Sequence, residues 1–159
     1  MTTPSEWCHD DESLTDLGLS HWKVLQKKQG FHFSLDAVLL AHFAPLKNHW
    51  RICDLGSGCG VIPLLLSSRA ENLVIDGVEL QAELADMAAR SLQLNGLTHI
   101  QIHEADLREL PAAWRDRYDL VVTNPPYFPL ESGRLSPLPQ VALARHELAC
   151  TLDDVLTAA

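Results

Sequence analysis

Short apolar runs alternate with amphipathic segments from about residue 50 onward. The segments 61–69 and 81–96 place apolar residues at helical spacing, and 108–117 predicts a short helical turn. The apolar runs between them have the length and residue types of strands. These runs are RICDL (51–55), NLVIDGVEL (72–80), HIQIHEADL (99–107) and YDLVVTN (118–124). Because strands that alternate with helices form parallel sheets, we predict a Rossmann-like α/β fold with helices on both faces of the sheet.

Two of the predicted helices have recognisable ends and apolar faces. Residues 33–44 predict a helix with Ser34 as its N-cap. Its apolar face is expected to contain Leu35, Val38, Leu39 and either Ala41 or His42. The helix over 81–96 is expected to end at Gly96, because glycine readily adopts the left-handed conformation found at helix C-termini. Its buried face is expected to contain Leu84, Met87, Ala88, Ser91 and Asn95.

The C-terminal part of the chain has a different character. Residues 128–147 are rich in proline and predict a long loop, after which Thr151 and Asp154 have the spacing of a capping box that opens a helix. The strand before this loop is apolar on both faces, which is typical of an interior strand. As the last strand of a sheet it would be a bare, aggregation-prone edge. We therefore expect the chain to be the front half of a longer domain.

The composition is that of one globular domain. Of 159 residues, 47% are apolar and 21% charged, and the apolar runs are much shorter than the roughly 20 residues of a membrane helix. The N-terminus has neither a basic start nor an apolar core, so it does not indicate a secretory signal. Four cysteines without C-x-x-C spacing favour reduced thiols and a cytoplasmic location. We expect no metal site, since His99 and His103 lie in a predicted strand.

The net charge is −9, from 12 basic and 21 acidic residues. This balance argues mildly against a surface that coats nucleic acid broadly. The charges are unevenly placed, however, with three lysines and no acid in residues 21–30. A local basic strip that docks one RNA is therefore compatible with the sequence.

A glycine-rich loop, DLGSGCG (54–60), follows the strand at 51–55. Glycines let a backbone pass close beneath a ligand, and the following helix N-terminus supplies unpaired N–H groups. Gly56, Gly58 and Gly60 are spaced two residues apart, unlike the G-x-G-x-x-G fingerprint of dinucleotide sites. Asp54 precedes them and would repel a pyrophosphate but attract an ammonium group. S-adenosylmethionine carries an amino group and a sulfonium, and we predict it as the cofactor.

Two further acids follow the next strands. Glu79 ends the second strand, where a carboxylate accepts hydrogen bonds from ribose hydroxyls, as NAD would also require. Asp106 ends the third strand, where it would accept from the adenine amine. Three acids at three successive strand ends, together with the glycine spacing, favour a cofactor site.

The fourth strand ends in Asn124, Pro125, Pro126 and Tyr127, at the crevice where open α/β sheets bind ligands. Proline fixes φ and removes an N–H donor, so this turn presents carbonyl oxygens on a stiff backbone. The Asn124 side-chain oxygen and the Pro125 carbonyl would accept both protons of an amino group on a planar ring. Those bonds stabilise the charge that builds on methyl transfer, by about 3 kcal/mol for one such contact. Tyr127 would stack on the base, at roughly 1–3 kcal/mol.

These residues resemble the class I S-adenosylmethionine-dependent methyltransferases that use an N-P-P-Y motif on amino nitrogens. The segments FSLDAVLLA and ARHELACTLDD narrow the resemblance to the bacterial valine-tRNA adenine-N6 methyltransferase family, in its Gram-positive-type branch. The resemblance runs from roughly residue 12 to the last residue. N-P-P-Y alone indicates only the class.

The resemblance implies methylation of the adenine next to the anticodon of a tRNA. The cofactor is expected to contact Asp54, Gly56, Gly58, Gly60, Glu79, Asp106 and Asn124. The flipped adenine is expected to lie against residues 124–127, with Phe128 and Arg145 also binding the substrate. Ser34 and Asp36 would close over the methionine end of the cofactor, although the N-cap role explains Ser34 equally well. Arg145 and His146 are as compatible with a plain surface role as with a contact to RNA phosphate.

The family's sheet has seven strands, and this chain is expected to supply the first four and the start of the next helix. We therefore expect an N-terminal extension over 1–30 and a partial methyltransferase domain over 31–159.

Other functions stay open at this point. A protein-glutamine methyltransferase also fits N-P-P-Y, but such enzymes usually carry a helical domain before the glycine loop. A DNA adenine methyltransferase would normally add a target-recognition domain. A nicotinamide-dependent dehydrogenase is disfavoured by the glycine spacing and by Asp54. A catalytically inactive fragment that binds the cofactor or a partner is the alternative from another class, although intact Asp54, Glu79, Asp106 and Asn124 argue against long decay.

Overall fold

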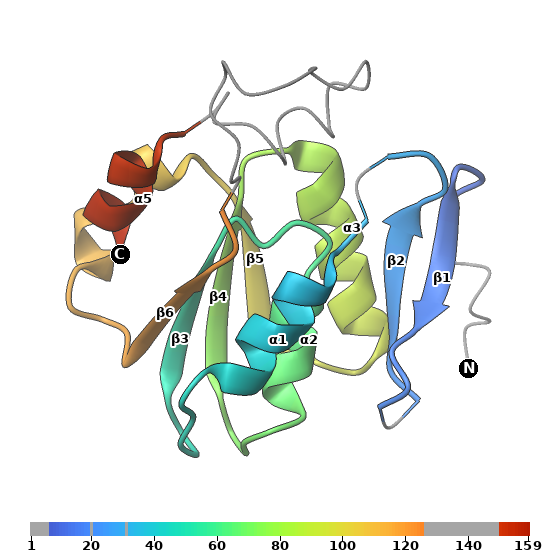
Figure 1. The fold of residues 1–159 in the computed structure, drawn as a ribbon, viewed down its shortest axis with the longest axis horizontal. Helices are drawn as coiled ribbons and strands as arrows, with labels where there is room; N and C mark the ends of the chain where they lie inside the picture. Colours follow the sequence, from blue (N-terminus) through green and yellow to red (C-terminus); the bar gives the residue numbers. More distant parts are fainter. Residues whose placement is uncertain (1–6, 20, 31, 126–149) are drawn as a thin grey trace.

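Four parallel strands form the central sheet of the computed structural model, which describes residues 7–19, 21–30, 32–125 and 150–159 (Figure 1). The strands lie in the order β5-β4-β3-β6. Their bounds are Arg51–Leu55 for β3, Val74–Glu79 for β4, Ile100–Glu104 for β5 and Leu120–Thr123 for β6. All four strands predicted from the sequence are confirmed, and three of them end inside the predicted apolar runs.

The carboxyl ends of the four strands meet at one edge of the sheet. Leu55 at the end of β3 pairs with Val78 of β4 on one side and with Thr123 of β6 on the other. Glu79 at the end of β4 pairs with Glu104 at the end of β5. The loops that follow the strands therefore lie side by side, which is where open α/β sheets bind ligands.

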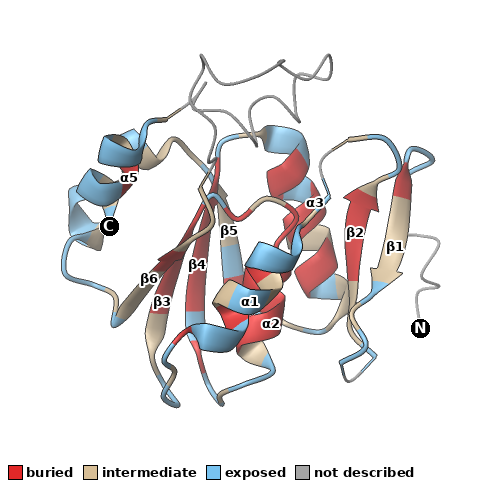
Figure 2. Cartoon of the chain, in the orientation of Figure 1, coloured by how far each residue is buried: buried red, intermediate tan, exposed pale blue. Residues whose placement is uncertain are grey.

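Three helices cover one face of the sheet (Figure 1). They are α1 (Leu35–Phe43), α2 (Val61–Ser67) and α3 (Ala82–Leu94). Ile52, Ile75, Ile100 and Val122 of the strands pack with these helices in the larger core. Helix α2 is buried along most of its length, as its red ribbon in Figure 2 shows, because it lies between the sheet and α1.

The opposite face carries a smaller core around Cys53, Leu55 and Val78. Two 3₁₀ turns, η2 (Leu107–Glu109) and η3 (Ala112–Trp114), and the helix α5 (Leu152–Ala158) cover it. Helices therefore lie on both faces, as predicted. The predicted capping box of α5 is also confirmed, since the Thr151 hydroxyl accepts from the Asp154 N–H and the Asp154 carboxylate accepts from the Thr151 N–H.

A two-stranded antiparallel hairpin, β1 (Glu12–Asp16) and β2 (Lys23–Lys27), packs beside α3 (Figure 1). Val24 and Leu25 of β2 are fully buried in the larger core. The edge of β2 that does not pair with β1 forms hydrogen bonds with side chains at the C-terminal half of α3. The Ser91 hydroxyl accepts from the Leu25 N–H at 3.0 Å, and the Asn95 side chain pairs with both backbone groups of Lys23. These side chains thus pair with backbone groups of β2 that would otherwise be unpaired at the strand edge.

Helix α1 differs from its predicted apolar face. Ala37 and Ala41 are its buried residues, whereas Leu35 and Leu39 are 69% and 44% exposed. Two alanines four residues apart let α1 approach α2 closely, so the small side chains face inward and the larger ones outward. Ser34 occupies the N-cap position without a capping hydrogen bond. In the described part of the chain, no helix is long and apolar enough to cross a membrane.

Candidate active site

The glycine loop leaves the end of β3 and folds over the end of β4. Gly56 and Gly58 have φ values of 77° and 55°, a left-handed conformation that glycine adopts without strain. The Gly56 and Ser57 N–H groups both donate to the Val78 carbonyl, at 2.8 and 2.9 Å. These bonds place Gly56 and Gly58 in the wall of a cavity at the carboxyl edge of the sheet.

Two other glycines allow this loop to pack. A Cβ at Gly60, the N-cap of α2, would lie 3.0 Å from the Ala88 Cβ, so glycine lets α2 begin against α3. A Cβ at Gly77 in β4 would lie 2.4 Å from the Ser57 Oγ and 2.6 Å from the Ile102 Cδ1. Gly60 is outside the cavity lining and packs against α3, and its contact with the cofactor stays a prediction. Gly77 was not singled out from the sequence, although a glycine inside a strand pattern indicates a close approach.

Asp54 is the penultimate residue of β3 and is fully buried. Neither of its carboxylate oxygens has a hydrogen-bond partner among the described residues. Burial raises the pKa of this carboxyl to about 7, and the nearby Ser57 hydroxyl, which donates to the Asp54 backbone carbonyl at 3.1 Å, acts against that rise. Buried polar groups are nearly always paired, so the unpartnered Asp54 carboxyl beside the glycine loop is an exception, although Asp54 itself does not line the cavity.

Glu79 ends β4 and is already engaged with the backbone. Its Oε2 accepts from the Gly58 N–H and its Oε1 from the Gln81 N–H, both at 2.8 Å. Burial raises the pKa of Glu79, while the Gln81 and Gly58 N–H groups act against that rise. An ionised carboxylate has about four acceptor positions, so two are left for a ligand in the cavity that Glu79 lines.

Asp106 follows β5 and caps η2. Its carboxylate accepts from the Arg108 N–H at 2.9 Å and from the Arg108 Nε at 2.9 Å. The hydrogen bond from the Arg108 guanidinium lowers the pKa of Asp106, which therefore stays ionised in the cavity wall. The sequence predicted Asp106 as a site residue but not its partner, since the pairing depends on the turn that η2 makes.

Strand β6 brings Asn124 and Pro125 to the same cavity. Thr123 precedes them, and its hydroxyl donates to the Leu55 carbonyl at 2.9 Å. The other predicted residues of this region lie outside the described residues, and their roles stay predictions. These are Pro126, Tyr127, Phe128, Arg145 and His146.

The cavity thus gathers residues from the ends of all four strands. The predicted residues that line it are Gly56, Gly58, Glu79, Asp106, Asn124 and Pro125, whereas Asp54 lies buried behind the lining and Gly60 lies outside it. An apolar wall was not predicted, and it contains Leu80, Leu84, Leu107 and Val155. Val155 comes from α5, so only the tertiary fold brings it here. Ser34 and Asp36 are not part of the lining, and the Ser34 hydroxyl donates to the Asp36 carboxylate at 3.2 Å.

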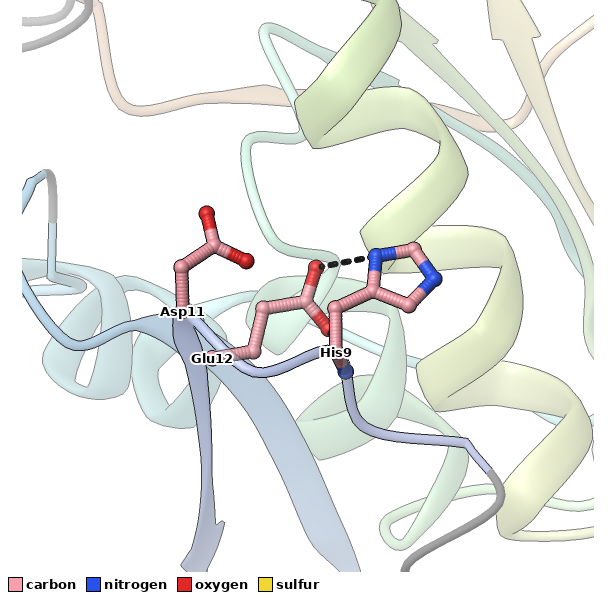
Figure 3. A group of neighbouring side chains, drawn as sticks. All are labelled: His9, Asp11 and Glu12. Carbon is pink, nitrogen blue, oxygen red and sulfur yellow. Dashed lines mark hydrogen bonds and ion pairs between the residues drawn. The ribbon is translucent and has the colours of Figure 1, made fainter.

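A second polar cluster lies at the start of β1, where ligand atoms of His9, Asp11 and Glu12 are within 4.8 Å of one another (Figure 3). Both acids already have cationic partners. Arg90 donates two hydrogen bonds of 2.7 Å to the Glu12 carboxylate, and Lys27 donates one of 2.7 Å to Asp11. We therefore interpret the cluster as an ion-pair network that joins the hairpin to α3, and assign no metal to it.

The parallel sheet, the glycine loop and the acids at the strand ends define a Rossmann-like methyltransferase domain. Residues 34–134 match the family described as the methyltransferase small domain, and the chain belongs to this family.

Relatives of known name are similar over part of their length. The chain is 34% identical over 126 residues to a tRNA1(Val) (adenine(37)-N6)-methyltransferase of Escherichia coli O157:H7, covering 78% of this chain and 51% of the relative. It is 43% identical over 95 residues to the enzyme of the same name from Serratia proteamaculans, covering 58% of this chain and 36% of the relative. The chain therefore spans about half the length of the relatives that it matches.

The solved structure of TrmN from Thermus thermophilus is similar in fold, with a TM-score of 0.50 and 26% identity. The similarity covers 57% of this chain and 27% of that chain.

Proposed function

We propose that this chain binds S-adenosylmethionine in the cavity at the strand ends and takes part in methylation of the exocyclic amino group of adenine in tRNA. The observation that carries the proposal is Asp54, a buried carboxylate without a hydrogen-bond partner among the described residues, which lies two residues before Gly56 at the start of the glycine loop. An ammonium group is the partner that such a carboxylate needs, and a dinucleotide pyrophosphate would be repelled by it.

The residues present fit this cofactor from end to end. Asp54 and the glycine loop would hold the amino-acid end, and the remaining acceptor positions of Glu79 would take the ribose hydroxyls. Asp106 would accept from the adenine amine, with Leu80, Leu84 and Val155 providing apolar contacts. When bound, S-adenosylmethionine supplies an electrophilic methyl group on its sulfonium.

Asn124 and Pro125 would act on the nucleophile. The amino group of adenine is a poor nucleophile because its lone pair is delocalised into the ring. Hydrogen bonds from its two protons to the Asn124 side-chain oxygen and the Pro125 carbonyl favour a pyramidal nitrogen and stabilise the charge that develops on it. This arrangement requires no separate general base. Stacking of the base on Tyr127 belongs to the same proposal, with Phe128 and Arg145 as further substrate contacts.

The tRNA substrate is proposed from the names of the relatives, which describe enzymes acting on adenine 37 of tRNA1(Val). We place this function in the cytoplasm, where tRNA is processed in bacteria. The net charge of −9 means that RNA binding would depend on a local basic surface rather than on the whole molecule.

Cofactor binding is tested first, by titrating S-adenosylhomocysteine into the purified chain in a calorimeter. Wild-type protein is expected to bind, and Asp54→Asn is expected to bind at least about tenfold more weakly, since a charge-assisted hydrogen bond contributes about 1.5–3 kcal/mol. Asp16→Asn on the exposed hairpin turn is the matched control. Absence of binding by folded wild-type protein would refute the cofactor assignment.

Activity is tested separately, with methyl-labelled S-adenosylmethionine, unmodified tRNA and mass spectrometry of the nucleosides. Label in N6-methyladenosine that is lost in Asn124→Ala supports the proposal. A chain that binds S-adenosylhomocysteine but transfers no label would instead be a cofactor-binding fragment, which is the alternative function that the sequence leaves open.

A further inference from the structure

Thr123 links the two strand ends on which the proposed reaction depends. Its hydroxyl donates to the Leu55 carbonyl at 2.9 Å, across 68 residues of sequence. The two residues are also paired in the parallel ladder, where they are the last pair between β3 and β6. Thr123 is partly buried and lines the cavity itself.

The sequence that follows explains why this side chain is needed. Pro125 and Pro126 have no N–H group, so the backbone beyond Asn124 cannot extend the ladder toward the glycine loop. The Thr123 hydroxyl adds a donor at the last position where β6 still reaches β3. Threonine is branched at Cβ and has restricted χ1 rotation, which favours a fixed bond over a mobile one.

Each member of this pair stands immediately before a residue of the site. Gly56 follows Leu55 and begins the glycine loop, and Asn124 follows Thr123 and is followed in the sequence by the two prolines. Both Gly56 and Asn124 line the cavity. The Thr123–Leu55 bond is therefore a direct side-chain connection between the strand that leads into the glycine loop and the strand that leads into Asn124.

We propose that Thr123 is a positioning residue, whose hydroxyl fixes the spacing between the glycine loop and Asn124. The inference rests on the proposed function, since it concerns the alignment of donor and acceptor in that reaction. Misplacement of reacting groups by about 1 Å can lower a rate by about a hundredfold, so one bond at this place has a large effect on turnover. It has a small effect on cofactor affinity, because Glu79 and Asp106 are held by the Gly58, Gln81 and Arg108 N–H groups and not by Thr123.

The test uses two substitutions, of which one preserves the shape of the side chain and the other preserves the hydroxyl. Thr123→Val removes the donor and retains the branched shape, whereas Thr123→Ser retains the donor and removes a methyl group. Thr15→Val is the matched control, because Thr15 in β1 also makes one side-chain hydrogen bond, accepting from Gln26, but lies in the hairpin. For each protein we would measure the turnover number with tRNA, the Kd for S-adenosylhomocysteine and the Tm.

Thr123→Val is expected to lower the turnover number at least about tenfold. We expect its Kd to stay within about twofold of the wild-type value, because the cofactor contacts are unchanged. Thr123→Ser and Thr15→Val should keep most of the wild-type turnover. Wild-type turnover in Thr123→Val, or equally slow turnover in Thr123→Ser, would overturn the inference. So would a Kd that weakens together with the Tm, because that pattern indicates general damage to the fold.

A second measurement separates this inference from the proposed function. If wild-type protein binds S-adenosylhomocysteine but shows no turnover, the proposed activity fails. The effect of the cofactor site on Asn124 is then measured by NMR of the Asn124 side-chain amide. A ligand-induced shift in wild type and Thr123→Ser that is absent in Thr123→Val supports the positioning role. The same shift in all three proteins overturns it.

Discussion

The Glu79 carboxylate holds the glycine loop through the Gly58 N–H, which donates to its Oε2 at 2.8 Å. The acid at the end of β4 and the loop after β3 are thus joined before any ligand binds. The same carboxylate accepts from the Gln81 N–H at the start of α3. One side chain therefore organises the segments after two neighbouring strands.

Glu79→Gln is expected to weaken both stability and ligand binding. An amide offers one acceptor oxygen, so one of the two backbone N–H groups would face an NH₂ donor instead of an acceptor. Leaving a buried donor unsatisfied costs about 1–3 kcal/mol in the free energy of unfolding. Urea unfolding and calorimetry with S-adenosylhomocysteine would measure the two effects. Glu71→Gln, at an exposed position before β4, should change neither quantity, and equal effects at both positions would contradict this role of Glu79.

Asp54→Asn is expected to stabilise the unliganded protein increasingly as the pH rises. Burial raises the pKa of Asp54 from its ordinary value of 3.8 to about 7. Between these values the native state binds a proton that the unfolded chain releases, so the free energy of unfolding of the wild type falls as the pH rises through this window. For a shift of this size the loss reaches about 4 kcal/mol.

The measurement is the difference in urea unfolding between Asp54→Asn and wild type at about pH 5 and about pH 8. Glu79 titrates in both proteins, so the difference reports mainly on Asp54. We expect the variant to gain stability relative to wild type at the higher pH. A difference that does not change with pH would show that Asp54 is ionised in the native state at both values, or paired with a group inside the protein.

Gly77→Ala is expected to displace the glycine loop, because residue 77 lies against Ser57 of that loop. The new Cβ would meet the Ser57 Oγ and the Ile102 Cδ1 at distances shorter than any normal contact. Overpacking of this kind costs about 1–3 kcal/mol, and displacement of Ser57 should also weaken S-adenosylhomocysteine binding. Gly96→Ala provides the control, because its strain from a φ of 72° lies at the end of α3, away from the cavity. Weaker binding in Gly96→Ala, or unchanged binding in Gly77→Ala, would contradict this interpretation.

Glu12→Gln is expected to loosen the hairpin without affecting the cavity. Glu12 is 2% exposed, and although burial tends to raise its pKa, the hydrogen bonds from Arg90 and the His9 N–H hold that pKa below its usual value. Breaking a buried pair on one side costs up to about 3–5 kcal/mol when the remaining charge is left uncompensated, and here Arg90 keeps Asp86 as a partner, so we expect a smaller loss. Thermal unfolding should show this loss. The Kd for S-adenosylhomocysteine should not change as long as the protein is folded.

The pKa of Glu12 also predicts a pH dependence. Since the native pKa lies below that of the unfolded chain, the stabilisation by this pair is present above the unfolded value and is lost as the pH falls through the native one. Arg90→Met removes the main cationic partner and would leave the buried Glu12 carboxylate with the His9 N–H and the more distant Lys27 ammonium as partners. We expect this variant to be the less stable of the two at neutral pH and to recover stability on mild acidification. An opposite order would show that Arg90 is not the main partner of Glu12.

Much of the sheet and the site follows from local sequence. The four strands, the glycine loop, Glu79 and Asp106 were all predicted, because apolar periodicity and residues at strand ends are local signals. The sequence pattern predicts only an N-terminal extension over residues 1–30 and does not predict the hairpin. Its turn signal is short, with Asp16 accepting from the Gly18 N–H, and its burial depends on α3, which lies far along the chain.

The residues that were missed are those whose role depends on two distant segments. Gly77 is required by Ser57, and Thr123 bonds to Leu55, so neither role is visible from its own neighbours. The apolar face predicted for α1 was wrong in part for the same reason. Helical spacing predicts that Leu35 and Leu39 lie on the buried face. In the structure, however, α1 packs closely on α2, and Ala37 and Ala41 are its buried residues.

The hydrogen bonds between α3 and the edge of β2 change what a substitution on this side of the helix means. Alanine at the buried position 91 would improve intrinsic helix propensity, and a scale based on isolated helices would score it as favourable, while Asn95 lies at the C-cap just after the helix. In this protein, alanine at either position would leave backbone groups of Lys23 or Leu25 without a partner. Variation along this side of α3 is therefore constrained by the geometry of a strand that precedes it by about 70 residues in the chain, so that the helix and the hairpin have to evolve as one unit.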